Sequence, residues 1–157
     1  MKLYRYSPIH SQESLGKAVG YVAEKSQELC AKLTAEHLEF SGVLTICSHY
    51  YEEYDVLANI LTEMGTFDKE HNGPRVVLHK PFKTPYGQIA RLRIRHPDPY
   101  RYQVGAGDFR VADYEQFKQA HLTDDNPYIR EIIRPDLTML EFWHPDYDVV
   151  GYIVKKE

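Results

Sequence analysis

The sequence predicts an α+β fold made of two βαβββ units, with an additional helix ahead of the first unit. Three observations lead to this prediction. Apolar residues recur at helical spacing near the N-terminus. At two places in the chain a strand-like segment is followed by a helix-like segment, and short stretches of alternating apolar and polar residues come after each of these pairs. An internal repeat is the simplest organisation that accounts for this order.

The composition is that of a folded soluble domain. The chain has 157 residues, of which 43% are hydrophobic and 27% are charged, which excludes a disordered or fibrous protein. No apolar run reaches the length of a membrane-spanning helix, and the first residues lack the apolar stretch of a signal peptide, so no membrane partner is expected. Cys30 and Cys47 lie in apolar patterns typical of buried thiols in a reducing compartment, which predicts a cytoplasmic location.

The charge distribution points to a small anion rather than to nucleic acid. The net charge of −4 argues against nucleic acid as the main partner, because phosphate binding normally needs a basic surface. Between positions 91 and 110, however, the sequence carries more arginines than acidic residues. This local excess predicts an anionic small molecule as a partner.

The first half of the chain reads as a long helix followed by a strand and a second helix. Ser11 is a suitable N-cap for a helix over 11–35. The segment 39–47 is rich in β-branched and apolar residues and predicts a strand. Helical spacing returns over 50–64, and Gly65 is expected to act as the C′ cap of that helix.

Three further strands are expected after the second helix, at 66–70, 75–80 and 88–95. Turn-forming residues separate them at 71–74 and at 84–87. These strands complete the first βαβββ unit.

The segment 96–104 is predicted to link the two units, because Pro97 and Pro99 disfavour helix in the residues before them. A lid over a cleft is the alternative interpretation. A strand is then expected at 107–112, a short helix capped by Asp113, and strands at 128–134, 137–144 and 148–154. The expected organisation is a single domain over 1–157, divided into an N-terminal helical segment at 1–38, a first unit at 39–95, a linker at 96–104 and a second unit at 105–157.

Three local patterns resemble the vicinal-oxygen-chelate superfamily, which includes glyoxalases and extradiol dioxygenases. They are a strand at 42–47 followed by a helix ending at Met64-Gly65, the Asn-Gly, Arg, apolar-run and Lys pattern of 72–80, and the turn and glutamate strand of 134–141. Their order is most similar to YecM-like proteins, which also carry an extra N-terminal helix. The resemblance covers residues 29–154 and implies a curved mixed sheet around a cleft.

The resemblance also implies a divalent metal, held by a His or Glu on the first strand and a Glu on the last strand of each unit. In the first unit these positions fall on Ser41 or Gly42 and on Arg91 or Arg95, none of which is a suitable ligand. A cation cannot replace a metal-binding carboxylate.

In the second unit the opening position falls on Ala106 or Asp108, depending on the strand register, and Glu141 matches the final glutamate. The resemblance therefore implies Glu141 and Asp108 as metal ligands, and strand alternation adds His79 as a histidine on the cleft face. An unpaired carboxylate in the apolar run around Glu141 would be costly, so Glu141 needs a partner. The residues alone allow that partner to be either an arginine or a metal.

The alternation of charged and apolar residues predicts a ligand-binding face. In a strand, alternate residues point to the same side of the sheet, so the arginines of 91–95 share one face. Arginine forks match carboxylates and phosphates. The expected ligand-binding residues are Arg75, Arg91, Arg93, Arg95 and Arg110. The alternative is an ion-pair network in which these arginines pair with Glu141, Asp108 and neighbouring acids.

Two further histidines, His49 and His144, allow two interpretations. Each is either a functional group, as a metal ligand or a general base, or a turn residue whose ring is hydrogen-bonded within the protein.

Two functional hypotheses follow. The first is a divergent glyoxalase-like enzyme that uses a metal and acts on an acidic metabolite. The second is a non-catalytic module that has lost the metal and binds a small anion or another partner. The missing ligands favour binding, whereas the concentration of ionisable groups favours chemistry. A homodimer is compatible with an open sheet flanked by helices.

Overall fold

The computed structural model describes residues 4–70, 73–98 and 100–156. Over these residues the chain is α+β, with three helices and one sheet of eight strands. The elements in chain order are α1 (Gln12–Thr34), β1 (Glu39–Cys47), α2 (Tyr51–Met64), β2 (Gly65–Glu70), β3 (Gly73–Thr84), β4 (Gly87–Arg95), β5 (Gly105–Arg110), α3 (Tyr114–His121), β6 (Ile129–Arg134), β7 (Leu137–Phe142) and β8 (Val149–Val154). None of the helices in the described part of the chain is long and apolar enough to cross a membrane.

The sheet is mixed and open, with the strand order β2-β3-β4-β1-β5-β8-β7-β6. The two central strands, β1 and β5, are antiparallel to each other. On either side, β1 pairs in parallel with β4, and β5 pairs in parallel with β8. Each half of the sheet is therefore made of four strands that follow one another in the chain, and β2 and β6 form the two edges.

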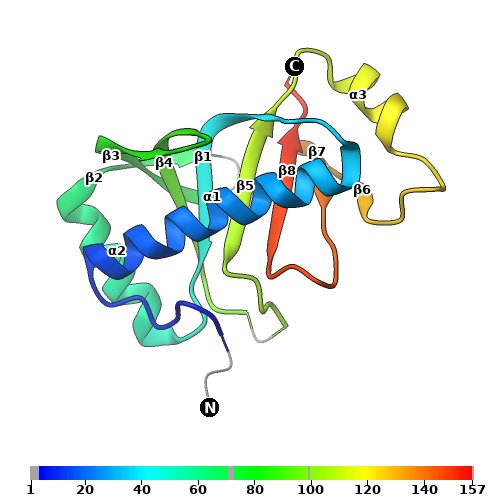
Figure 1. The fold of residues 1–157 in the computed structure, drawn as a ribbon. Coiled ribbons are helices and arrows are strands. Elements are labelled where there is room, and N and C mark those ends of the chain that lie inside the picture. Colours follow the sequence, from blue (N-terminus) through cyan, green and yellow to red (C-terminus); the bar gives the residue numbers. More distant parts are fainter. Residues whose placement is uncertain (1–3, 71–72, 99, 157) are drawn as a thin grey trace.

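The helix α1 crosses the middle of the sheet and covers one of its faces (Figure 1). Ser11 caps its first turn through a capping box with Ser14, as the sequence predicts for the cap. Its buried side chains, such as Leu15, Val22 and Leu29, pack on the central strands. The helix α2 contributes to the same core and contacts β2, β3 and β4.

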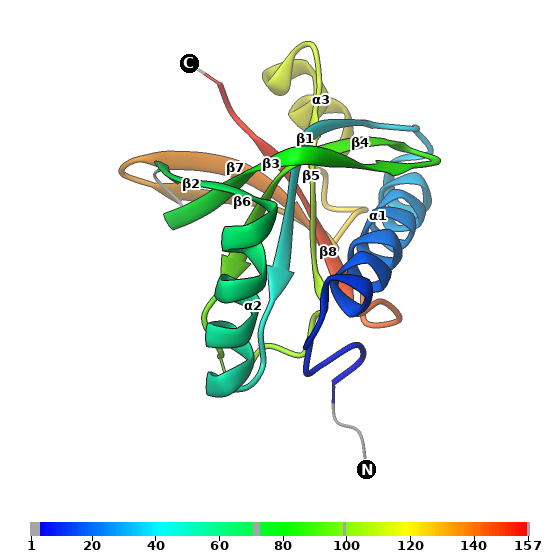
Figure 2. The ribbon, with the colours of Figure 1, turned by 90° about the vertical axis from the view of Figure 1, so that its left-hand side faces the viewer.

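The opposite face of the sheet is concave. In Figure 2 the outer strands β2, β3, β6 and β7 curve to the side away from α1. A smaller apolar cluster of Ala106, Met139, Val150 and Tyr152 lies apart from the main core, on this side of the central and C-terminal strands. We call this side of the sheet the concave face.

Most element positions agree with the sequence prediction, and the differences occur at ends. Gly65 is not a left-handed cap: its φ of −176° is extended, and it begins β2 directly, while its backbone N–H still bonds Leu61 O. The third strand runs over Gly73–Thr84 and is longer than expected. The predicted turn at 71–74 includes His71 and Asn72, which lie outside the described residues.

The contact between α1 and the central strands depends on glycine. A Cβ on Gly105 would lie 2.1 Å from Thr45 O and 3.1 Å from the Val22 side chain, so β5 could not keep its place between β1 and α1. Gly20, on the outer side of α1, has no atom within 4 Å of such a Cβ.

This difference yields a paired prediction. Gly105→Ala is expected to lower the free energy of unfolding by about 2–3 kcal/mol, because a backbone contact has to open. Gly20→Ala is expected to raise it by up to about 1 kcal/mol, because alanine is the better helix former at an open position. Urea denaturation of the two variants measures both effects. Equal effects of the two substitutions would contradict the close packing.

Candidate ligand-binding site

The arginines of β4 lie on the concave face. Leu92 and Ile94 pack in the core below α1, so strand alternation sends Arg91, Arg93 and Arg95 to the other side. Arg75 on β3 lies opposite Arg93 in the ladder and shares its face. Four of the five arginines predicted to bind a ligand are therefore neighbours.

Two of these four arginines have partners within the protein. Arg75 holds Asp68 through Nε and a terminal nitrogen, at 3.0 Å and 3.2 Å. This bond lowers the pKa of the Asp68 carboxyl, and Arg91 and Arg93 contribute to the same effect. Arg93 is buried and also interacts within the protein. The buried Nε atoms of Arg91 and Arg93 have no hydrogen-bond partner among the described residues, although Arg93 interacts through other atoms.

Arg110, the fifth predicted residue, does not belong to this group. It is the last residue of β5 and lies beside Glu39 at the start of β1, with which it forms an exposed ion pair. Cys47 and Arg95 lie at the opposite end of β1 and β4. Because β1 and β5 run in opposite directions, Arg110 is held away from the β4 arginines. It lines a separate hollow beside α3.

At the carboxyl end of β1 and β4, two guanidinium groups converge on two buried neutral groups. Arg95 lies beside Cys47 in the ladder, and Arg101 reaches in from the linker to interact with Cys47, Glu141 and the hydroxyl of Tyr152 on β8. Burial raises the pKa of the Cys47 thiol to about 11, against the opposing effect of Arg101 and Arg95. The thiol is therefore protonated at neutral pH, which does not suit a nucleophile.

The same two arginines also act on the hydroxyl of Tyr152. Burial raises the pKa of its hydroxyl, and Glu141 raises it further, whereas Arg95 and Arg101 act in the opposite direction. The phenol is therefore neutral and lies between one carboxylate and two guanidinium groups. It can donate or accept a hydrogen bond without changing its charge.

Glu141 has an arginine partner. Arg130 on β6 donates to Oε1 from Nε at 2.7 Å, and its terminal nitrogen lies at the same distance. The pair is asymmetric, since the Glu141 side chain is 8% exposed and that of Arg130 is 64% exposed. The sequence contains a signal for this pair: the two-residue turn that pairs Arg134 with Leu137 also places Arg130 opposite Glu141.

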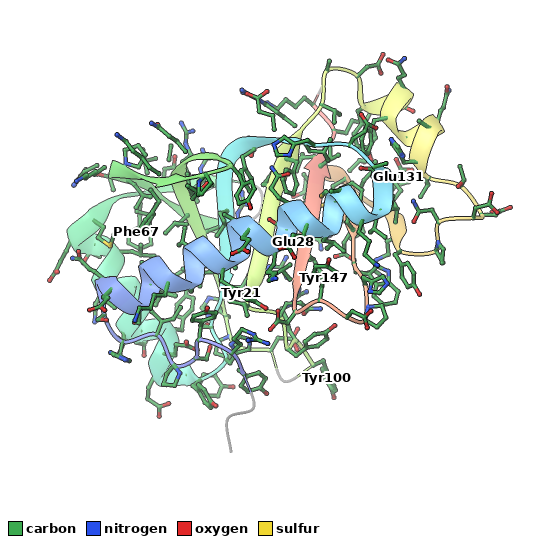
Figure 3. All side chains as sticks on the ribbon, viewed as in Figure 1. Tyr21, Glu28, Phe67, Tyr100, Glu131 and Tyr147 are labelled. Atoms are coloured by element: carbon green, nitrogen blue, oxygen red, sulfur yellow. The ribbon has the colours of Figure 1, made fainter. Side chains whose placement is uncertain are left out.

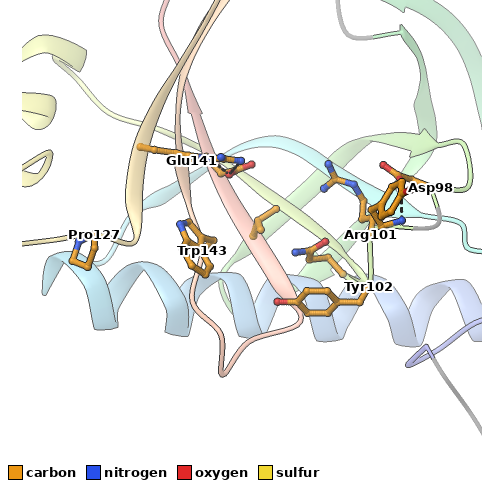
Figure 4. Close-up of a pocket in the computed structure, with 10 residues that line it drawn as sticks. Asp98, Arg101, Tyr102, Pro127, Glu141 and Trp143 are labelled. Atoms are coloured by element: carbon orange, nitrogen blue, oxygen red, sulfur yellow. Dashed lines mark hydrogen bonds and ion pairs between the residues drawn. The ribbon is translucent and has the colours of Figure 1, made fainter.

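A pocket of about 600 Å³ lies over this part of the concave face. Figure 4 shows Arg101 and Glu141 on two sides of it, with their charged ends turned toward each other. It is lined by Asp98, Tyr100, Arg101, Tyr102, Gln103, Pro127, Arg130, Glu141, Trp143 and Val150. The segment 96–104 thus contributes side chains to the pocket as well as joining β4 to β5. Tyr100 is 94% exposed and extends outward from it (Figure 3).

The three residues that the resemblance implies for a metal do not come together. Asp108 is on β5 and Glu141 on β7, with Tyr152 of β8 between them in the ladder. His79 is exposed on β3, in the other half of the sheet. Glu141 also lies on the next-to-last strand rather than on the last. No cluster of three or more His, Cys, Asp or Glu that could hold a metal occurs among the described residues. Asp108 instead accepts a hydrogen bond from Ser41 Oγ at 3.1 Å.

His49 and His144 both make contacts typical of turn residues. His49 contacts Ser7 Oγ through Nδ1 at 2.7 Å and the Gln103 carbonyl through Nε2 at 2.9 Å. Since a carbonyl only accepts, Nε2 carries the proton and Nδ1 accepts from the hydroxyl. His144 accepts the backbone N–H of Asp146 within its own loop.

The site therefore comprises Arg95, Arg101, Tyr152 and the Glu141–Arg130 pair. Sequence reasoning did not single out Arg101, Arg130 or Tyr152 for this site, and Arg101 in particular lies in the segment interpreted as a connector. Comparisons of the chain with protein-family models, with curated proteins and with solved structures find no match.

The asymmetry of the Glu141–Arg130 pair can be tested by removing each partner. Arg130→Met is expected to cost about 2 kcal/mol, because it leaves a buried carboxylate without its cation. Glu141→Gln is expected to cost about 1 kcal/mol or less, because an exposed guanidinium returns to water and glutamine keeps the shape. Denaturant titration gives both values. A larger loss for Glu141→Gln would show that the carboxylate has another function.

A second prediction concerns pH. Burial lowers the pKa of His49 below its usual value of 6.5, so the folded state favours the neutral ring. The stability that this ring contributes is present above pH 6.5 and is lost as the pH falls through the lowered value. The free energy of unfolding, followed from about pH 7.5 to pH 5, should fall less steeply in His49→Gln than in the wild type. Parallel curves would show that His49 titrates as it does in the unfolded chain.

Proposed function

We propose that the chain binds a small organic anion in the pocket of the concave face, on a sheet of two paired βαβββ modules as in the vicinal-oxygen-chelate superfamily. The module assignment is supported by the order strand, helix and three strands, which occurs at β1–β4 and again at β5–β8. In both cases the first and last strands are parallel neighbours. The same pairing in both halves supports a repeated module, which is what the resemblance in the sequence implies.

The convergence of Arg95 and Arg101 supports the anion. Both guanidinium groups act on Cys47 and Tyr152, which are neutral and therefore do not balance their charge. Two carboxylates are near, but Arg130 holds Glu141 and Asp98 accepts the backbone N–H of Tyr100. Two cations that share neutral neighbours in a partly desolvated site favour the entry of a carboxylate or phosphate.

The site also has the shape of a binding pocket. Its volume of about 600 Å³ lies within the usual range for small-molecule sites, and it combines apolar walls with a few polar groups. The charged groups that line the pocket come from the linker, β6 and β7, so they are positioned by the sheet and by the segment that joins its two halves. Such an arrangement can orient a ligand without further rearrangement.

Of the two functional hypotheses, binding needs only Arg101 in the pocket wall and Arg95, which acts on the same thiol and phenol. The metal-dependent enzyme would need Glu141, Asp108 and His79 at one ion, and these lie on β7, β5 and β3. We therefore propose a binding protein in which the arginines take up the anion directly.

The test is a titration of the wild-type protein with acetate, benzoate, succinate and inorganic phosphate. Calorimetry measures the binding, and the shift in melting temperature provides a second readout. At least one organic anion is expected to bind, and Arg101→Met should weaken it about tenfold or more, since a charged hydrogen bond contributes about 1.5–3 kcal/mol.

The matched control is Arg110→Met, which removes an arginine at the far end of β5 and should leave the affinity unchanged. Binding is also expected to persist after treatment with a chelator. Binding that requires added manganese or zinc, or equal losses in the two arginine variants, would contradict the proposal.

A further inference from the structure

We infer that the pocket selects anions whose charged group is attached to a flat aromatic ring, such as aryl carboxylates, over aliphatic anions of the same charge and size. This inference rests on the proposed anion-binding function and specifies the class of ligand. It is based on the second wall of the pocket, which the arginines do not form.

That second wall is aromatic. Trp143 and Tyr102 line the same pocket as Arg101 and Glu141, and Figure 4 shows them on the side opposite to the charged groups. Trp143 is 37% exposed and Tyr102 is 46% exposed, so both keep ring surface outside the protein core. Partly exposed aromatic side chains are unremarkable when they are scattered, but here two of them border one pocket. Pro127 adds a further apolar surface.

Both side chains have a contact within the protein, Trp143 through its ring and Tyr102 through its hydroxyl. Trp143 packs edge-on against Tyr128, with ring centroids 5.2 Å apart and an interplanar angle of 84°, and its backbone N–H bonds Tyr128 O. The hydroxyl of Tyr102 donates to Tyr147 O at 3.4 Å. A ring that is already fixed loses little side-chain entropy when a ligand packs on it. The surfaces facing the pocket are therefore prepared for a flat partner.

The two walls together define the ligand class. A carboxylate at Arg101 leaves the rest of the ligand over Trp143 and Tyr102. An aromatic ring there gains stacking or edge-to-face contacts in addition to the burial of apolar area, whereas a puckered ring of the same size gains burial alone. The predicted ligand is a one- or two-ring aromatic acid.

The experiment compares benzoate with cyclohexanecarboxylate, which carry the same charge on rings of the same carbon number. Calorimetry is expected to give about a tenfold tighter dissociation constant for benzoate, and 2-naphthoate should bind at least as tightly. Trp143 is the single tryptophan of the chain, so a change in its fluorescence on binding locates the ligand in this pocket.

Two substitutions separate the two walls. Trp143→Leu should reduce the preference for benzoate over cyclohexanecarboxylate to less than about threefold, whereas Arg101→Met should weaken both acids alike and leave their ratio unchanged. Tyr102→Leu, in a half-exposed linker side chain, tests the same wall should Trp143→Leu fail to fold.

The outcomes distinguish the inference from the function on which it rests. Equal affinity for the two acids, lost in Arg101→Met, would overturn aromatic selection and keep anion binding. A preference for benzoate that is unchanged in both aromatic variants would also overturn the inference. If neither ring acid binds the wild type but succinate or acetate does, the inference is overturned and anion binding is kept; if none of these organic anions binds, the proposed function itself is wrong.

Discussion

The packing of α1 on the two central strands determines where every charged side chain of the sheet can lie. The helix approaches β5 closely because Gly105 and Gly107 present no side chain to it; a Cβ on Gly107 would lie 2.3 Å from Ser26 Oγ. The part of the sheet that faces α1 is then lined by apolar core residues. Since side chains alternate along a strand, the polar half of each strand has only the opposite face available. The arginines of β4 therefore gather on the concave face because of a contact that involves none of them.

A buried polar cluster connects the N-terminal segment to the linker, and through it to the site. The buried Glu53 accepts the backbone N–H groups of Ile9 and His49, each at 2.6 Å. The ring of His49 in turn holds the carbonyl of Gln103, two residues after Arg101. Hydrogen bonds to a buried carboxylate are strong and directional, so this cluster fixes the chain on one side of Arg101. The extra N-terminal segment thereby contributes to the position of a residue in the pocket.

The sequence predicts the elements well and the site only in part, for a physical reason. The segment Glu39–Cys47 and the helix Tyr114–His121 are read correctly because strand propensity and the Asp113 cap act locally. The β4 arginines follow from alternation as well. By contrast, Arg101 lies in a loop, whose conformation depends on tertiary contacts such as that of His49 with Gln103. The separation of Arg110 from the other arginines depends on the antiparallel pairing of β1 with β5, which periodicity does not reveal.

The charge on the concave face is more than the fold requires. Asp68 with Arg75 and Glu141 with Arg130 are pairs that a sheet can use to satisfy polar groups across neighbouring strands. Arg95 and Arg101 are different, because both lie beside a thiol and a phenol that are neutral at physiological pH. Smaller polar residues would fill those positions without mutual repulsion, as Thr45 does on β1. An anion bound in the pocket, as we propose, would make use of this excess of positive charge. The aromatic wall beside Arg101 is a second feature that the folded core does not need. Trp143 and Tyr102 leave part of their ring surface exposed there, whereas residues of the core are buried.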